Sequence, residues 1–131
     1  ATTEIYTLSL HDALPILLSD KNFRIKPSIK GLDCSLSGIE NKAKAMIENG
    51  ESKQDISKFV LTYISTSIEK MTELLLEKYG DLPLVFAGGV MSNTLIKANL
   101  VNRFSAYFAK PEFSCDNAAG IAIYAYLKDI V

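Results

Sequence analysis

The sequence is constrained most by residues 82–93, which read LPLVFAGGVMSN. Four apolar residues, 84–87, run into the pair Gly88-Gly89, and Ser92-Asn93 then precedes an amphipathic segment, 94–103. This order predicts a buried strand that passes through a tight glycine turn into the N-terminus of a helix. Such a junction suits a phosphate or a nucleotide, because glycine lets the backbone approach a ligand and helix N-terminal amides are free donors. The alternative is that the glycines only turn the chain.

Composition places the chain among ordinary globular domains. Its 131 residues are 48% hydrophobic and 22% charged, with a net charge of −1. That charge argues against a general nucleic-acid footprint but leaves room for RNA binding through a local patch or a partner subunit. No apolar run approaches the roughly 20 residues that cross a bilayer, so we expect no membrane partner. We expect Cys34 and Cys115 to be reduced thiols in a cytoplasmic protein.

The opening segment, residues 1–17, fits the rest of the chain poorly. The sequence begins with Ala, and its run YTLSLHDALPI resembles translated adapter DNA joined to a reading frame. We therefore expect residues 1–17 to be non-native or disordered, and we place no chemistry on His11. The alternative is a genuine local strand or helix.

Once residues 1–17 are set aside, the first half of the remaining sequence predicts one strand and two helices. Residues 21–30 are basic and include Pro27, which favours an extended or loop-like segment, and residues 31–37 alternate apolar and polar positions as a strand does. Ser37 and Glu40 match a capping box, which predicts a helix to about Glu48 that ends at Asn49-Gly50. Residues 52–79 carry apolar side chains at three- and four-residue steps, which predicts a long helix with one core-facing stripe.

The second half predicts alternating strands and helices. After the helix at 94–103, residues 106–109 indicate a strand, residues 110–113 a loop and residues 118–129 a last helix with several small residues. The complete order is β-α-α-β-α-β-α. It predicts an α/β fold in which helices cover a mixed sheet.

Three collinear motifs resemble one protein family. LDCSLSGIENKA resembles a strand followed by the helix start SFSGLKTA, AGGV with Asn93 and a basic residue at Lys97 resembles AGGVxxN, and YFAKPEFSCDNAAGIA resembles PEFCTDNGAMIA. These are the motifs of the TsaD or Gcp family of tRNA threonylcarbamoyladenosine transferases, long labelled glycoproteases. The resemblance covers about residue 18 to the C-terminus. The residues of the motifs are similar to those of a divergent bacterial paralogue.

The resemblance implies a fold and a site. Residues 18–131 would be the C-terminal lobe of an actin-like ATPase fold with ribonuclease-H-like topology. The family transfers threonylcarbamoyl from its adenylate to an adenosine of tRNA. By resemblance, Gly88, Gly89 and Asn93 bind the adenylate or an ATP-type nucleotide, and Asp116 is a ligand of an iron or zinc ion; no catalytic residue is assigned. Such a metal would polarise the acyl donor while the tRNA amine attacks.

Local structural roles remain open for the same residues. Asn93 can cap its own helix, and Asp116 or Ser114 can cap the last one. The chain also lacks the family's His-x-x-x-His metal pair, and a lone carboxylate holds a catalytic metal poorly. We therefore expect neither transferase activity nor a tight metal site from this chain alone.

Two further functions compete with a transferase fragment. The first is a non-catalytic scaffold or dimerisation subunit of the same family, which forms a heterodimer with a paralogue or a homodimer. The second, more distant, is metallopeptidase-like activity, which the old glycoprotease label suggests but for which neither Ser37 nor Cys34 has a histidine base in the trusted sequence. Exposed apolar surface on a lone lobe would favour self-association.

Overall fold

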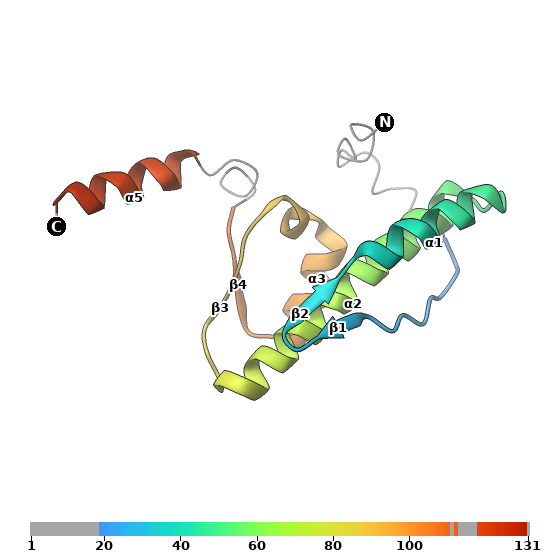
Figure 1. The fold of residues 1–131 in the computed structure, drawn as a ribbon, viewed down its shortest axis with the longest axis horizontal. Helices are drawn as coiled ribbons and strands as arrows, with labels where there is room; N and C mark the ends of the chain where they lie inside the picture. The colour runs from blue at the N-terminus through green and yellow to red at the C-terminus, as the bar shows by residue number, and fades with distance from the viewer. Residues whose placement is uncertain (1–18, 111, 113–117, 131) are drawn as a thin grey trace. The chain divides into compact units, whose positions relative to one another are not determined.

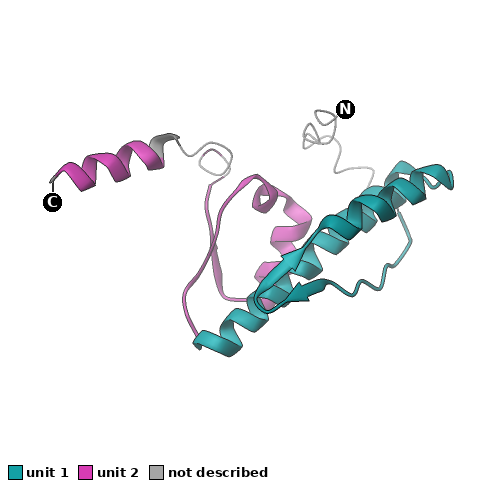
Figure 2. Cartoon of the chain, in the orientation of Figure 1, with its two compact units in different colours: residues 1–80 teal, residues 81–131 magenta. Residues whose placement is uncertain are grey.

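The chain forms two compact units, Ala1–Gly80 and Asp81–Val131 (Figure 2). The computed structural model describes residues 19–110, 112 and 118–130 (Figure 1). Helices and small sheets alternate along it, which confirms the predicted α/β class. The described strands form two separate two-stranded sheets, however, and differ in this from the single mixed sheet that we expected. The suspect residues 1–17 lie outside the described part.

A short hairpin opens the described part of the first unit. Strand β1 (Ser28–Lys30) pairs antiparallel with β2 (Asp33–Ser35), so that Ile29 lies opposite Cys34. Gly31 turns the chain between them with a φ of 61°. The predicted strand over 31–37 is therefore shorter than expected, because its first two residues form the turn. The basic segment before it supplies the second strand.

Helix α1 spans Ser37–Glu48. Asn49 is its C-cap and Gly50 follows with a φ of 72°, so the helix ends where the sequence predicted. The prediction of a capping box at the start of α1 is wrong. Leu36 holds the N-cap position without a side-chain hydrogen bond, while the hydroxyl of Ser37 lies 3.0 Å from that of Ser35. Because Ser37 is already helical, its side chain does not reach the free amides, and Glu40 pairs with Lys44 one turn later at 2.7 Å.

Helix α2 (Lys53–Tyr79) begins and ends where the sequence signals predicted. The Ser52 hydroxyl accepts a hydrogen bond from the Asp55 amide at 3.1 Å, and Gly80 ends the helix with a φ of 83°. With 27 residues the helix is about 40 Å long. It contacts α1, β1 and β2, and therefore carries the other elements of this unit.

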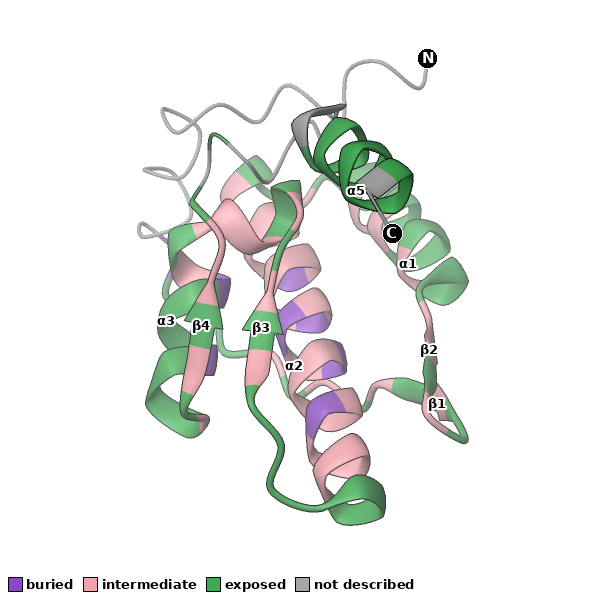
Figure 3. Cartoon of the chain, turned by 90° about the vertical axis from the view of Figure 1, so that its left-hand side faces the viewer, coloured by how far each residue is buried: buried purple, intermediate pink, exposed green. Residues whose placement is uncertain are grey.

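The buried surface of α2 is less apolar than the sequence predicted. Phe59 and Tyr63 of the expected stripe are buried, the stripe's other members are half-buried, and Tyr79 is exposed. Figure 3 shows buried and half-buried residues following one another along α2. Three small hydroxyl residues are also buried: Ser65, Ser67 and Thr72. Ser67 and Thr72 each donate to the carbonyl four residues back at 2.8 Å, so these groups are satisfied within the helix.

The second unit is built on a strand–helix–strand motif that the sequence predicted closely. Strand β3 (Leu84–Phe86) and strand β4 (Ala106–Phe108) pair in parallel, with Val85 opposite Tyr107. Between them run a 3₁₀ helix, η2 (Gly89–Ser92), and α3 (Thr94–Arg103). Parallel strands need such a crossover, and α3 supplies the most buried apolar side chains of the unit, Ile96 and Leu100.

The β3–β4 sheet has two different faces. On one face the rings of Phe86 and Phe108 stack 5.2 Å apart. On the other face Val85 and Tyr107 each remain 71% exposed. Helix α5 (Ala118–Ile130) also exposes its apolar side chains, from Ile121 to Leu127. None of the described helices is long and apolar enough to cross a membrane.

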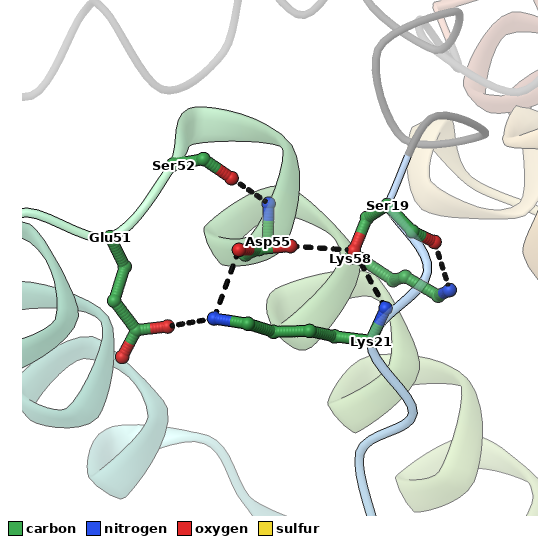
Figure 4. A network of polar contacts seen from close by, with 6 residues as sticks. All are labelled: Ser19, Lys21, Glu51, Ser52, Asp55 and Lys58. Atoms are coloured by element: carbon green, nitrogen blue, oxygen red, sulfur yellow. Dashed lines mark hydrogen bonds and ion pairs between the residues drawn. The ribbon is translucent and has the colours of Figure 1, made fainter.

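A polar cluster fixes the start of the described chain to the first turn of α2 (Figure 4). The Ser19 hydroxyl donates to an Asp55 carboxylate oxygen at 2.7 Å, and Lys21 pairs with Asp55 and Glu51 at 3.0 Å each. Lys58 donates to the Ser19 carbonyl. The hydrogen bond from Ser19 and then that from Lys21 lower the pKa of Asp55, and Asp55 followed by Glu51 raises the pKa of Lys21.

This cluster predicts a loss of stability in acid. Because the pKa of Asp55 is lower in the folded chain than its ordinary value of 3.8, its contribution is complete above that value and disappears as pH falls through the folded pKa. Urea unfolding between about pH 5 and pH 2 should show the free energy of unfolding falling with pH. Asp55→Asn should flatten this dependence, whereas Glu48→Gln, at the exposed end of α1, should leave it in place. Equal slopes in all three proteins would contradict the assignment.

Candidate functional site

The glycine turn after β3 depends on the backbone of Gly88. Its φ of 105° and ψ of 158° lie in a region that side-chain-bearing residues rarely adopt. A Cβ added at Gly88 would meet no atom of the described residues within 4 Å. Glycine is therefore needed here for its dihedral angles, and the space around it stays open on that side.

The turn continues into η2 and leaves two backbone donors available. The first hydrogen-bonded amide is that of Met91, which donates to the Gly88 carbonyl at 3.0 Å. The amides of Gly89 and Val90 precede it, and neither has an acceptor among the described residues. Both residues are exposed. Two adjacent N–H groups are thus presented at the end of β3.

Asn93 caps α3, as one of the two readings of the sequence predicted. Its side-chain oxygen accepts hydrogen bonds from the amides of Leu95 at 3.0 Å and Ile96 at 3.2 Å. The expectation that the helix presents free amides is therefore wrong for these two. The carboxamide nitrogen of Asn93 has no acceptor within the part of the chain that the structure describes, so the residue retains a donor.

Ser92 adds a feature that the sequence did not indicate. Its hydroxyl oxygen is buried and has no hydrogen-bond partner in the described structure. Such a group costs about 1–3 kcal/mol if it stays unpaired. Only its position beside Asn93 could have drawn attention to it. The junction therefore holds a polar atom whose need for a partner is unmet.

Lys97 follows one turn into α3. Its ammonium group lies 5.2 Å from the centre of the Phe108 ring, so a cation–π contact ties the helix to β4. The structure thus places the basic residue of the AGGV motif beside the sheet that carries the glycine turn.

The expected metal ligand Asp116 lies outside the described residues, as do Ser114 and Cys115. Across residues 19–110, 112 and 118–130, no group of three or more His, Cys, Asp and Glu side chains could hold a metal ion. The described residues alone therefore do not fit an iron or zinc centre. Gly88, Gly89 and Asn93 lie together at the β3–α3 junction, while the role of Asp116 as a metal ligand stays a prediction.

Comparison with known proteins relates the chain to a family of tRNA-modifying enzymes. No family model matches the chain. A curated tRNA N6-adenosine threonylcarbamoyltransferase from Mycoplasma mobile is 33% identical to it over 116 residues. The match covers 86% of this chain and 38% of the relative, so the chain spans well under half the length of that protein. The family resemblance of the three motifs is confirmed.

The backbone of Gly88 predicts a difference between the two glycines of the turn. Gly88→Ala should lower the free energy of unfolding by about 1–3 kcal/mol, because alanine is strained at positive φ even without a steric clash. Gly89→Ala is the matched control, since Gly89 is not among the residues with positive φ and begins η2. Urea unfolding of both variants measures the difference. A larger loss for Gly89→Ala would contradict this account.

Proposed function

We propose, because the chain is a homologue of part of a tRNA N6-adenosine threonylcarbamoyltransferase, that it forms one wall of the nucleotide site of such an enzyme. The relative is named for transfer of threonylcarbamoyl to adenosine of tRNA. In this proposal the chain binds the adenylate that donates the group, and tRNA is the acceptor. The finer fold assignment, the C-terminal lobe of an actin-like ATPase, is part of the same proposal.

The observation that carries the proposal is the set of donors at the β3–α3 junction. Gly89 and Val90 offer backbone N–H groups, and Asn93 offers its carboxamide nitrogen, all within five residues. A nucleotide brings phosphate oxygens, ribose hydroxyls and base nitrogens, which are the acceptors such donors bind. The open space beside Gly88 lets the ligand approach the backbone.

In the proposed reaction these residues position the donor and do not take part covalently. The two turn amides would hold anionic oxygens of the adenylate, and Asn93 would orient its ribose or base. Held in this way, the acyl carbon is fixed while the amine of the tRNA adenosine attacks, and positioning lowers the entropic part of the barrier. The family's metal would supply charge stabilisation, with Asp116 as the one ligand from this chain.

The chain matches 38% of the relative. In this proposal, residues beyond that matched part supply the second wall of the site. Two or three hydrogen bonds to one side of a nucleotide bind weakly, because the ligand stays largely hydrated. The chain alone therefore binds nucleotide weakly and transfers no threonylcarbamoyl group.

A scaffold function is the second candidate, and exposed apolar surface favours it. Val85 and Tyr107 are exposed side by side on one face of the β3–β4 sheet, and α5 exposes further apolar side chains. Parallel sheets are ordinarily covered on both faces. A subunit that dimerises through this face would cover it without using the nucleotide site.

A substitution at Asn93 can test nucleotide binding while it preserves the helix cap. Asn93→Asp keeps an oxygen that caps α3, but it loses the amide donor and places a negative charge near the phosphates. Titration with ATP, followed by the backbone NMR signals of Gly88 and Gly89, should show affinity falling about tenfold or more in this variant. The signals of Leu95 and Ile96 should still report an intact helix start.

The matched control is Asn102→Asp, which makes the same change of charge at an exposed position of α3. It should bind ATP as the unaltered chain does. Nucleotide binding that survives Asn93→Asp, or no perturbation of the turn by ATP at millimolar concentration, would contradict the proposed function.

Self-association tests the scaffold alternative. Light scattering over a concentration series should show a mass that rises above that of one chain, and Val85→Lys/Tyr107→Lys should return it to a monomer, because the two charges would be buried in the interface. A monomer at every concentration for the unaltered chain would contradict this function and leave the nucleotide site unaffected.

A further inference from the structure

Residues 22–30 have two sides of different character. Their exposure alternates along the chain, as in an extended strand. The half-buried positions are Phe23, Ile25, Pro27 and Ile29. The ring of Phe23 lies 5.5 Å from that of Phe59 in an edge-to-face contact, and β1 contacts α2. Packing on α2 therefore accounts for Phe23 and β1 on the apolar side, and the other side faces solvent.

The solvent side carries a basic row, which we define as Arg24, Lys26 and Lys30. All three are exposed, and no described carboxylate lies within ion-pair distance of any of them. Lys21, by contrast, is held by Asp55 and Glu51. No acidic residue occurs between positions 21 and 32. The row is thus a local positive patch on a chain whose net charge is −1.

The basic row is fixed at both ends. Before it, Ser19 and Lys21 bind the first turn of α2 through Asp55 (Figure 4). After it, β1 pairs with β2, which places Lys30 opposite Asp33. A surface held in this way loses little backbone freedom when it binds a partner. Arg24 and Lys26, two positions apart, project about 7 Å from each other on the same side.

We propose that the basic row binds the phosphate backbone of tRNA, which rests on the proposed function for the identity of the RNA. Phosphate oxygens are the natural partners of exposed Arg and Lys, and Arg can bind them with two hydrogen bonds. Contacts of this kind position an RNA without reading its sequence. The basic row would supply positive charge that binds the RNA. In the sequence it lies far from the glycine turn that is proposed to bind the nucleotide.

RNA fits this surface better than an anionic membrane does. Membrane-bound basic segments usually carry four to eight cations or place large apolar side chains in the lipid interface. Here the exposed side has three cations, and its remaining members, Asn22 and Ser28, are polar. Phe23 packs on Phe59 of α2 and the other apolar side chains of the segment are half-buried, so they offer little surface for insertion. The other structural use of such charges is to protect the edge of β1 from pairing with another strand.

The test compares two triple variants with the same net charge. Arg24→Gln/Lys26→Gln/Lys30→Gln removes the basic row, and Lys42→Gln/Lys53→Gln/Lys78→Gln removes three exposed lysines of α1 and α2. An unmodified tRNA transcript is titrated with each 131-residue protein at several salt concentrations, and melting curves check that each variant is folded. The basic-row variant should bind about tenfold or more weakly at low salt, and the slope of log K against log salt should shrink by roughly 2–3.

Each outcome decides the proposal. The control variant should keep most of the affinity and slope, and Asp33→Asn should strengthen binding by removing the carboxylate opposite Lys30. Unchanged binding by the basic-row variant would assign the row to edge protection. Equal loss in both triple variants would assign binding to net charge, and binding to phosphatidylserine vesicles without tRNA binding would assign it to membranes. ATP titration of Gly88 and Gly89 is a separate readout, so failure of either proposal leaves the other measurable.

Discussion

The supply of backbone hydrogen bonds between β3 and α3 governs the second unit. Asn93 accepts from two amides at the start of α3, and Gly88 takes dihedral angles that lead β3 into η2. Without the first, α3 would begin with unsatisfied amides; without the second, the chain would not turn. The amides of Gly89 and Val90 are left without a partner among the described residues, and so the requirements of folding leave these donors for a ligand.

Much of this arrangement follows from local sequence. Helix α2 begins at the Ser52 cap and ends at Gly80 because both signals act within one turn of the chain. The β3, α3 and β4 bounds were predicted almost to the residue, since an apolar run and a 3.6-residue period leave few alternatives. Strand β1 was not predicted, because its three residues become a strand only by pairing with β2. The choice between capping and ligand binding at Asn93 likewise depended on three-dimensional geometry.

Side-chain partners were less predictable than elements. Ser37 and Glu40 fit a capping-box pattern, yet a start one residue earlier gives each a different neighbour, Ser35 and Lys44. Ser67 and Thr72 are buried on α2 at positions where a hydrophobic pattern alone would predict leucine or isoleucine. They are tolerated because each binds a carbonyl of its own helix. The candidate site shows the same limit, because the buried hydroxyl of Ser92 has no signature in the sequence.

The alternation of residues 22–30 also has a consequence for how the protein can change over time. One set of side chains packs on α2 and another meets solvent, and neighbouring positions belong to different sets. A substitution at Arg24 or Lys26 alters the surface potential without opening a cavity, whereas one at Phe23 alters packing without altering charge. The two properties can therefore drift separately. Divergent relatives can retain this segment of the fold while they gain, lose or exchange what it binds.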